Sequence, residues 1–188
     1  VKHKYSTIRL HPLPSNLYPS LLSTLYPLPS ITMSDVYLSL GSNLGDRHRL
    51  ITSAIALLAE RAGRTVAVSR CYETVPWGFQ SAHPFLNVAL SLRTDLAPLP
   101  LLDLTQQIER ELGRTVKSSP GGTYADRPID IDLIFYADTC LHTPRLTLPH
   151  PLMHLRRFVL EPLAEIAPTI IHPTLGRTVS ELLEQCPE

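Results

Sequence analysis

The spacing of Asp130 and Asp132 within an apolar run constrains the fold more than any other feature of the chain. Side chains alternate between the two faces of a strand, so Ile129, Ile131 and Leu133 point into a core while the two aspartates share the opposite face. The carboxylates then lie about 7 Å apart and repel each other unless water, arginine or a divalent cation compensates. Such a pair suits magnesium, which usually takes one or two carboxylates together with substrate phosphates. The alternative is an edge strand with a solvated polar face.

The bulk composition predicts one folded domain. The chain has 188 residues, of which 44% are hydrophobic and 18% are charged, and this is enough for a proper core. The formal net charge is zero, so we expect no nucleic-acid partner and no membrane recruitment, and no apolar run reaches the length of a bilayer span. The cysteines lack Cys-x-x-Cys spacing, which predicts reduced thiols and a cytoplasmic location. They are Cys71, Cys140 and Cys186.

Arginine dominates the basic residues, because only three of the 17 are lysine. Its planar fork of donors matches phosphate in a bidentate way, although a codon-usage bias would produce the same excess. Position is more informative, since the stretch 139–160 contains no acidic residue and directly follows the aspartate strand. We therefore expect a cationic wall beside the carboxylates. Its basic side chains are Arg145, Arg156, Arg157, His142, His150 and His154.

The first 34 residues differ from the rest of the chain. Prolines recur through this segment and interrupt any helix or secretory apolar region. Either Met33 is the true start and the segment is upstream sequence, or the segment is a transit peptide that directs the chain to an organelle. We favour the first interpretation, because the segment has few arginines and no amphipathic period. In both cases we expect 1–34 to be a disordered N-terminal extension and 35–188 to be the single domain.

Periodicity along the domain predicts the order strand, helix, strand, strand, helix, strand. The first helix begins after Asp46, a capping residue, and ends at Gly63. The second helix begins at Pro98 and ends at Gly113. The expected strands cover residues 36–40, 65–74, 85–92 and 127–136.

This order is the split β-α-β, ferredoxin-like motif of an α+β fold. We expect both helices on one face of a four-stranded antiparallel sheet, and Asn87, Asp130 and Asp132 on the other face. The chain after residue 137 is a proline-rich C-terminal extension, with short helices over 156–166 and 178–185. This extension is expected to fold over the polar face.

Short motifs follow one another from about Val36 to the C-terminus. They are Gly41-Ser42-Asn43-Leu44-Gly45, Tyr72-x-Thr74-x-Pro76-x-Gly78, Phe85-Leu86-Asn87, Gln106-x-x-Glu109, Gly113-Arg114, Arg127-x-x-Asp130-x-Asp132-Leu133, Arg145-Leu146-Thr147-Leu148-Pro149-His150 and Arg156-x-Phe158-x-Leu160-x-Pro162-Leu163. Each motif alone is weak. The ordered set resembles the 6-hydroxymethyl-7,8-dihydropterin pyrophosphokinase family of the folate pathway.

The resemblance implies a magnesium-dependent transfer of the β,γ-pyrophosphoryl group of ATP. The acceptor would be the hydroxymethyl oxygen of a reduced pterin, and AMP would leave. By similarity, Asp130 and Asp132 hold two magnesium ions, and Arg114 and Arg127 complete the catalytic group. Charge accumulates on the transferred group, so catalysis of this kind needs positioning and electrostatic stabilisation. A strand holds a carboxylate pair rigidly enough for two metals.

The resemblance also implies two sets of binding residues. The nucleotide set consists of Gln106, Glu109, Arg114, Lys117, Arg127, Arg145, Thr147, His150 and Arg156. A pterin is a flat, hydrogen-bonding heterocycle, so its pocket should combine stacking surfaces with amide groups. The pterin set consists of Thr74, Val75, Pro76, Trp77, Gly78, Phe85, Asn87, Tyr124, Asp130 and Phe158. Without the motifs, an exposed helix face would explain Gln106 and Glu109, and a salt bridge would explain Arg145.

The sequence departs from the family pattern at several positions. The loop 115–126 is longer and less basic than usual, and Tyr124 stands where the family commonly has a tryptophan. Trp77 replaces a frequent aliphatic residue, and Pro151 replaces a frequent aromatic one. We expect Phe158 and Tyr124 to stack on the faces of the pterin.

Two other classes of function compete with this interpretation. A palm-like nucleotidyl transferase also sets two carboxylates on a ferredoxin-like sheet, but it releases pyrophosphate where the pyrophosphokinase releases AMP. An RNA-binding or ligand-sensing module of the same fold is disfavoured, because the chain has no RNP-like aromatic run and no basic excess. We therefore expect a monomeric enzyme that acts on two small molecules, ATP and a reduced pterin.

Overall fold

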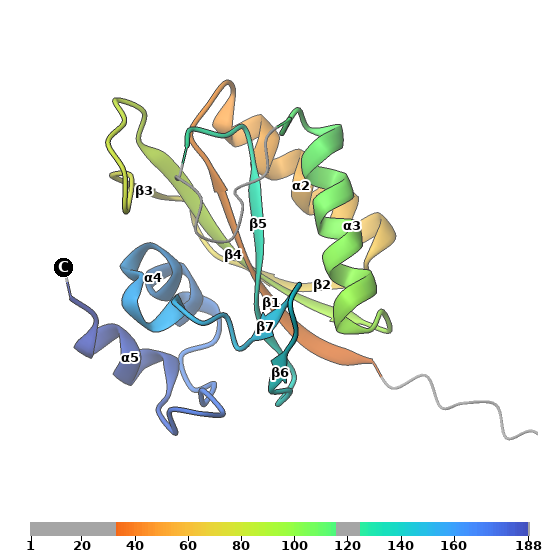
Figure 1. The fold of residues 1–188 in the computed structure, drawn as a ribbon, viewed down its shortest axis with the longest axis vertical. Helices are drawn as coiled ribbons and strands as arrows, with labels where there is room; N and C mark the ends of the chain where they lie inside the picture. Colours follow the sequence, from red (N-terminus) through yellow and green to blue (C-terminus); the bar gives the residue numbers. More distant parts are fainter. Residues whose placement is uncertain (1–32, 116–124, 188) are drawn as a thin grey trace, which may run out of the picture. The chain divides into compact units, whose positions relative to one another are not determined.

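A five-stranded antiparallel sheet forms the centre of the structure, a computed structural model that describes residues 33–115 and 125–187 (Figure 1). The strand order is β2-β4-β1-β5, and β3 also pairs with β4. Every neighbouring pair is antiparallel, as predicted. The strands are β1 (Ser34–Ser42), β2 (Arg64–Val68), β3 (Tyr72–Thr74), β4 (Phe85–Thr94) and β5 (Asp130–Tyr136).

The prediction of one strand over 65–74 is wrong, because the chain leaves the sheet between β2 and β3. The break lies at Ser69, whose hydroxyl accepts the Ala89 amide hydrogen at 2.9 Å and donates to the Arg70 carbonyl at 2.8 Å. A side chain thus takes the place of a backbone carbonyl in the ladder. The predicted four-stranded sheet consequently has five strands.

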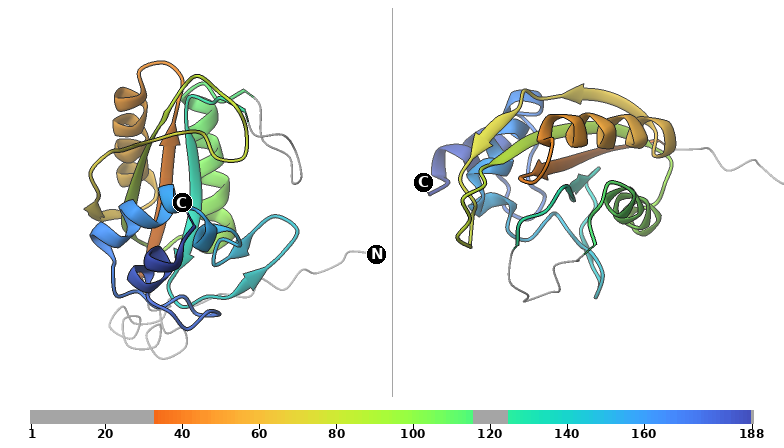
Figure 2. Two further views of the ribbon diagram at one scale, coloured as in Figure 1. Left: turned by 90° about the vertical axis from the view of Figure 1, so that its left-hand side faces the viewer. Right: turned by 90° about the horizontal axis from the view of Figure 1, so that it is seen from above.

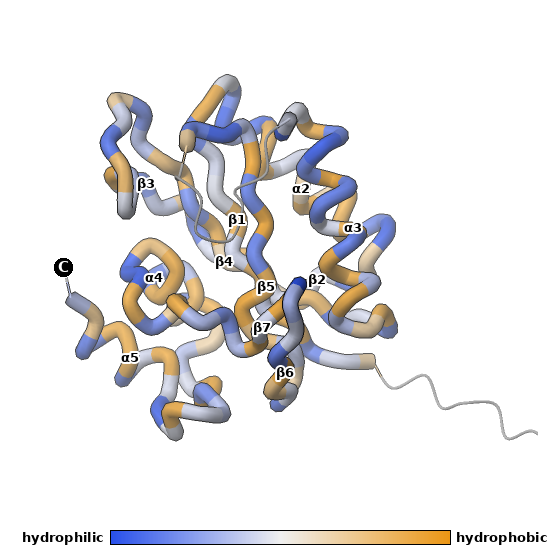
Figure 3. Tube along the Cα trace, in the orientation of Figure 1, coloured by the Kyte–Doolittle hydropathy of each residue, from blue (hydrophilic) through white to orange (hydrophobic). Residues whose placement is uncertain are grey.

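Helices α2 (Arg47–Arg61) and α3 (Pro98–Glu111) cover one face of the sheet, as the order of elements predicted (Figure 2). Their apolar stripes, which include the fully buried Leu58 and Ile108, pack against alternate residues of the strands in the main core. Figure 3 shows apolar positions recurring along both helices and along the strands beside them.

The helix ends follow the predicted capping residues. The Asp46 side chain accepts the Arg49 amide hydrogen at 3.1 Å and caps α2. Gly63 follows α2 at a φ of +144°, where a Cβ would lie 2.3 Å from the Arg93 carbonyl oxygen, so only glycine fits there. Thr178 caps the last helix in a reciprocal capping box.

The C-terminal segment covers the opposite face of the sheet, as predicted. It contributes the short helix η1 (Met153–Leu155) and the helices α4 (Arg157–Ile166) and α5 (Val179–Gln185). Apolar residues of this segment pack with Ala89 and Phe135 of the sheet in a second core. The sheet is therefore sandwiched between two helical layers of different origin (Figure 1).

A bulge in β5 gives two consecutive residues, Ile134 and Phe135, to the second core. The pairing of β1 with β5 shifts register between Tyr37 and Leu38, and this shift accommodates the extra residue. Before the bulge the alternation is regular, and Leu133 lies in the main core as predicted.

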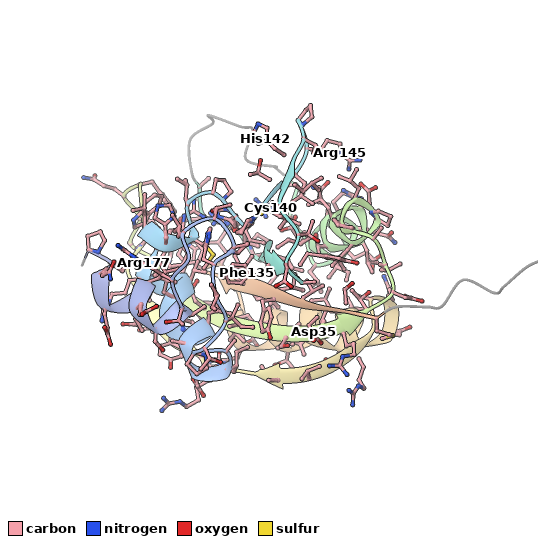
Figure 4. The ribbon with its side chains drawn as sticks, turned by 90° about the horizontal axis from the view of Figure 1, so that it is seen from below. Asp35, Phe135, Cys140, His142, Arg145 and Arg177 are labelled. Carbon is pink, nitrogen blue, oxygen red and sulfur yellow. The ribbon has the colours of Figure 1, made fainter. Side chains whose placement is uncertain are left out.

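Two short strands that the sequence analysis did not predict form a hairpin after the central sheet. They are β6 (Leu141–His142) and β7 (Thr147–Leu148). Figure 4 shows His142 and Arg145 near the tip of this hairpin, away from Phe135.

Several predictions concern the limits of the described residues. Ser34 is the first residue of β1, so the strand begins inside the segment predicted as an extension. Residues 1–32, together with Lys117 and Tyr124, lie outside the described part of the chain.

The three cysteines are free thiols. Within 33–115 and 125–187, no helix is both long and apolar enough to cross a membrane.

Candidate active site

One row of aligned residues crosses the sheet from β4 through β1 to β5. Gly41 is the register partner of Asn87 on one side and of Asp130 on the other. Because this middle residue has no side chain, a hollow separates the amide from the carboxylate. A Cβ at this position would lie 3.1 Å from Asn87 Oδ1 and 3.5 Å from Phe85 Cδ1. Glycine therefore keeps the floor of the site open.

The hollow is the floor of a pocket of about 480 Å³, including its open mouth. The pocket is lined by Ser39, Gly41, Thr74, Val75, Trp77, Phe79, Phe85, Asn87, Arg127, Asp130, Asp132, Arg156 and Phe158. Of the described residues predicted to bind the pterin, only Pro76 and Gly78 are not part of this lining.

Asp130 lies between two guanidinium groups. Arg114 donates to its Oδ1, and Arg127 Nη2 lies 2.6 Å from its Oδ2. Burial opposes ionisation of Asp130, but the charges of Arg127 and Arg114 outweigh it and hold the pKa of this carboxyl below its usual value. Asp130 is therefore an anion at neutral pH.

Glu109 connects α3 to the same cluster. Its Oε1 accepts hydrogen bonds from Arg114 Nη1 at 2.7 Å and from the Ile131 amide at 2.8 Å. Burial, opposed mainly by the charge of Arg114, raises the pKa of Glu109 to about 7. The carboxyl group that was predicted to bind nucleotide thus has buried partners in the protein, and it fixes both Arg114 and the start of β5.

Asp132 faces the same pocket in a different environment. Its side chain is 36% exposed, and its ion pair with Arg156 Nη1 is long, at 3.9 Å. Burial of the site and the negative charge of Asp130 raise the pKa of Asp132 to about 7, and Arg156 offsets this only in part. Two carboxylates from one strand face therefore differ: arginine neutralises the first, and the second opens onto the pocket.

An amide and two aromatic rings form the wall opposite the carboxylates. Asn87 Nδ2 donates to the Thr74 hydroxyl at 2.8 Å. The ring centres of Trp77 and Phe158 lie 6.4 Å apart, and the guanidinium carbon of Arg156 lies 4.9 Å from the first and 5.7 Å from the second. Aromatic faces beside an amide suit a flat heterocycle with hydrogen-bonding edges.

Six described residues predicted to bind nucleotide lie outside the pocket lining, and three of them also lie apart from the cluster around Asp130. Arg145, at the exposed hairpin, pairs with Asp103 of α3. The Thr147 hydroxyl is hydrogen-bonded to His142 Nδ1 at 3.2 Å within the same hairpin. Gln106 is half-buried on α3. The structure does not bring these three side chains together with the aspartates.

His150 also lies outside the lining, but it is held in a defined state. Its Nδ1 accepts the Leu152 amide hydrogen at 3.2 Å, which assigns the remaining proton to Nε2. Burial and the charge of Arg156 lower the pKa of His150 to about 4. The imidazole is therefore neutral at physiological pH and can donate through Nε2.

Three residues of the pocket lining were absent from the predicted site, namely Ser39, Gly41 and Phe79. Ser39 is the register partner of Asp132, so the alternation along the first strand carried a signal that identifies it. Phe79 packs edge-to-face on Phe85 with ring centres 6.3 Å apart. It lies in a loop, where no periodic pattern could have indicated it.

Asn43, which is only 2% exposed, joins three loops at the rim of the site. Its Oδ1 accepts the Arg127 amide hydrogen at 2.8 Å, and its Nδ2 donates to Asp126 at 2.6 Å and to the His83 carbonyl at 3.2 Å. This network holds Arg127 at the pocket. The buried Nε of Arg127 has no hydrogen-bond partner among the described residues.

The donors at the site suit magnesium but not a fully protein-coordinated metal. Among the described residues, no group of three or more His, Cys, Asp or Glu side chains gathers to hold an ion. Magnesium needs fewer, since it takes one or two carboxylates and completes its shell with water and phosphate oxygens. Asp132 is open to the pocket, and Asp130 keeps lone pairs beyond those used by arginine. The pair is therefore compatible with magnesium that arrives with phosphates.

The chain is similar to known proteins of one family. The model of the 7,8-dihydro-6-hydroxymethylpterin-pyrophosphokinase family matches residues 37–168. A 2-amino-4-hydroxy-6-hydroxymethyldihydropteridine pyrophosphokinase of Porphyromonas gingivalis is 55% identical over 142 residues, which cover 75% of this chain and 95% of that protein. The protein of the same name from Bacillus subtilis is 47% identical over 131 residues, covering 69% of this chain and 76% of its own.

Solved structures support the fold. A structure titled HPPK-DHPS in complex with substrates covers 81% of this chain at a TM-score of 0.65 and 15% identity. Wild-type Plasmodium falciparum HPPK-DHPS covers the same share at a TM-score of 0.64 and 17% identity. This chain spans less than half of those structures, 43% and 44% respectively. The family match and the relatives above, together with the shared fold, show that the chain belongs to the 7,8-dihydro-6-hydroxymethylpterin pyrophosphokinase family.

Proposed function

We propose that this chain transfers the pyrophosphoryl group of ATP to the hydroxymethyl group of 6-hydroxymethyl-7,8-dihydropterin, a step of folate biosynthesis that releases AMP. Family membership supports the reaction class. The observation that carries the proposal for this chain is the pocket itself, because it combines two carboxylates and two arginines with an amide and aromatic side chains. Phosphate chemistry and heterocycle binding both have suitable groups within it.

The carboxylate side of the pocket is the proposed site of the triphosphate. Asp130 and Asp132 would hold two magnesium ions, which supply charge neutralisation to the phosphates. Arg127 and Arg156 offer planar donor forks to phosphate oxygens. Arg114 acts from the side, since it fixes the Asp130 carboxylate.

The remaining nucleotide contacts are proposed for residues at the periphery. Gln106, Thr147 and Arg145 would contact the nucleotide beyond the pocket lining, and the neutral His150 would donate to a phosphate or the ribose. Since Arg145 already pairs with Asp103, nucleotide binding by this side chain requires that the ion pair open. The loop that contains Lys117 and Tyr124 was predicted to cover the substrates, and it lies outside the described residues.

The aromatic side is the proposed site of the pterin. Asn87 is positioned by Thr74 so that its carboxamide oxygen and second amide hydrogen stay available to the pterin edge. Phe158 and Trp77 would stack on the ring. The hydroxymethyl group would then point across Gly41 toward the aspartates, because both lie in one sheet row.

We also infer finer features of fold and assembly. The strand order β2-β4-β1-β5, with α2 and α3 on one face, supports a ferredoxin-like arrangement with a C-terminal extension on the other face. We also propose that the enzyme is a monomer. Three free cysteines support a cytoplasmic location, with an organelle as the alternative.

The test of this function is the product. Incubation with ATP, magnesium and reduced hydroxymethylpterin should release AMP, and omission of the pterin should abolish that release. Release of pyrophosphate would indicate a nucleotidyl transferase, and release of ADP a simple kinase. Either outcome would overturn the proposal.

Asp132→Asn tests the metal role. Loss of one charge at the open carboxylate should lower turnover about a hundredfold or more and weaken ATP binding less, because the phosphates need neutralisation most in the transition state. Asp138→Asn, at an exposed turn just beyond β5, is the matched control. An Asp132→Asn enzyme that turns over at the control rate would rule out the assignment.

A further inference from the structure

β3 is the least supported strand of the pocket wall. It has three residues, and its three register pairs are all with β4. Short edge strands open at low free-energy cost unless other contacts hold them. The chain continues from β3 into the loop 75–84, from which Val75, Trp77 and Phe79 line the pocket. The position of these three side chains therefore depends on how β3 is anchored.

Glu165 anchors β3 from the side of α4 (Figure 1). Tyr72 is the register partner of Asn87, and its hydroxyl donates to Glu165 Oε2 at 2.9 Å. The same carboxylate accepts the Arg70 amide hydrogen at 3.2 Å and lies 3.4 Å from the guanidinium Nε. Because Phe158 lies in the first turn of α4, Glu165 connects the two walls between which the aromatic part of the pocket lies.

Arg47 anchors the strand from the side of α2. Its Nη2 lies 2.9 Å from Glu73 Oε2, and its Nη1 donates to the Pro84 carbonyl at 2.7 Å. Glu73 precedes the loop and Pro84 ends it, so one guanidinium brackets both ends. A planar fork can make these two bonds at once, whereas a lysine ammonium is a single point of charge. The Arg47 side chain is only 27% exposed.

We propose that Glu165 and Arg47 are positioning residues that set the affinity for the pterin by fixing β3 and the loop 75–84. This inference rests on the proposed function, which assigns that wall to the pterin. Neither residue lines the pocket, and each acts through its neighbour on β3, Tyr72 or Glu73. Ion pairs near the surface contribute little to global stability, so their loss should loosen the loop without unfolding the protein.

The experiment compares Arg47→Gln, Glu165→Gln and the double variant with two matched controls. Arg49→Gln is the control for Arg47→Gln, because it removes a positive charge from the same turn of α2. Glu161→Gln is the control for Glu165→Gln, because it removes a negative charge one turn earlier on α4. Michaelis constants for pterin and for ATP are measured separately. Trp77 is the only tryptophan of the chain, so quenching of its fluorescence by acrylamide reports directly on the loop.

Arg47→Gln and Glu165→Gln should each raise the pterin KM about fivefold, with the ATP KM within about twofold of wild type. Acrylamide quenching of Trp77 should increase in both variants and increase further in the double variant. Arg47→Lys should resemble Arg47→Gln, because it cannot bracket both ends of the loop. The controls should match wild type in all three measurements.

Three results would overturn the proposal. The first is an unchanged pterin KM in both Arg47→Gln and Glu165→Gln. The second is an ATP KM that rises in step with the pterin KM, since this would indicate a general structural defect. The third is unchanged quenching of Trp77 in these variants. Failure of the proposed function is a separate result, because a wild-type chain that releases no AMP refutes that function and leaves the quenching measurement intact.

Discussion

At the scale of single residues, the site depends on one position without a side chain. Gly41 lies between Asn87 and Asp130 in the sheet row, and any Cβ there approaches the carboxamide that is proposed to pair with the pterin. Its importance comes from the space above it and not from its backbone conformation, because its φ is outside the left-handed region.

Gly41→Ala should therefore act as a steric block of the pterin site. The added methyl group must displace the Asn87 carboxamide, and overpacking of this kind typically costs about 1–3 kcal/mol, so we expect the pterin KM to rise roughly tenfold. ATP affinity, measured by titration in the absence of pterin, should stay nearly constant. An equal loss of affinity for both substrates would contradict this assignment of the two halves of the pocket.

At the scale of elements, the buried contact of α3 with β5 includes a polar link beside its apolar packing. Glu109 accepts hydrogen bonds from the Arg114 guanidinium and from the Ile131 amide, so one helix residue orients both the arginine that pairs with Asp130 and the strand that carries the aspartates. Groups that lose such a buried partner pay the full cost of desolvation.

Glu109→Ala should lower the free energy of unfolding by about 2–3 kcal/mol, because it leaves the Ile131 amide unsatisfied and removes one partner of Arg114. Glu109→Gln keeps an acceptor and should lower it by less than about 1 kcal/mol. Urea unfolding measures both, with the exposed Glu111→Gln as the control. A glutamine variant as unstable as the alanine variant would show that charge, and not hydrogen bonding, is what matters here.

Elements with a clear period were predictable from the sequence. The strands around Leu40, Val88 and Ile131 alternate polar and apolar residues, and α2 and α3 carry regular apolar stripes. The break at Ser69 was not predictable, because it depends on a hydrogen bond to Ala89 from another strand. Long-range partners of this kind leave no local pattern.

The candidate site was predictable to a different extent. The aspartates, Asn87 and the aromatic wall follow from alternation and from motif resemblance, and the structure gathers them in one pocket. The burial of Glu109 was not foreseen, since a helix position three residues after Gln106 is compatible with either solvent or a sheet edge. Only the tertiary placement of Arg114 decides between them.

At the scale of the whole molecule, the neutral His150 makes stability depend on pH. Its folded-state pKa is lowered to about 4 from an ordinary value near 6.5. His150 is therefore protonated below about pH 6.5 in the unfolded chain, but only below about pH 4 in the folded protein. The contribution of His150 to stability is complete above about pH 6.5 and is lost as the pH falls toward 4.

This loss should reach at most about 3 kcal/mol, from a lowering of roughly 2.5 pKa units. Unfolding free energies of wild type and His150→Gln, measured at pH 7 and pH 4.5, isolate the effect. The variant should lose less stability than wild type between the two conditions, whereas His142→Gln on the hairpin should follow wild type. Parallel pH profiles for all three proteins would show that His150 does not titrate abnormally.

The bulge at Ile134 and Phe135 divides one face of β5 into two halves. The acidic half, with Asp130 and Asp132, lines the pocket, and the apolar half is buried in the second core. Upstream of the bulge the strand lines the pocket that is proposed to bind phosphate and metal, and downstream the same face is covered by α4 and α5. Removing one of the two bulged residues would restore regular alternation, so that one side chain instead of two would reach the second core while the acidic half keeps its register. The fit of the C-terminal helices on this strand can therefore change by one side chain without moving the two aspartates.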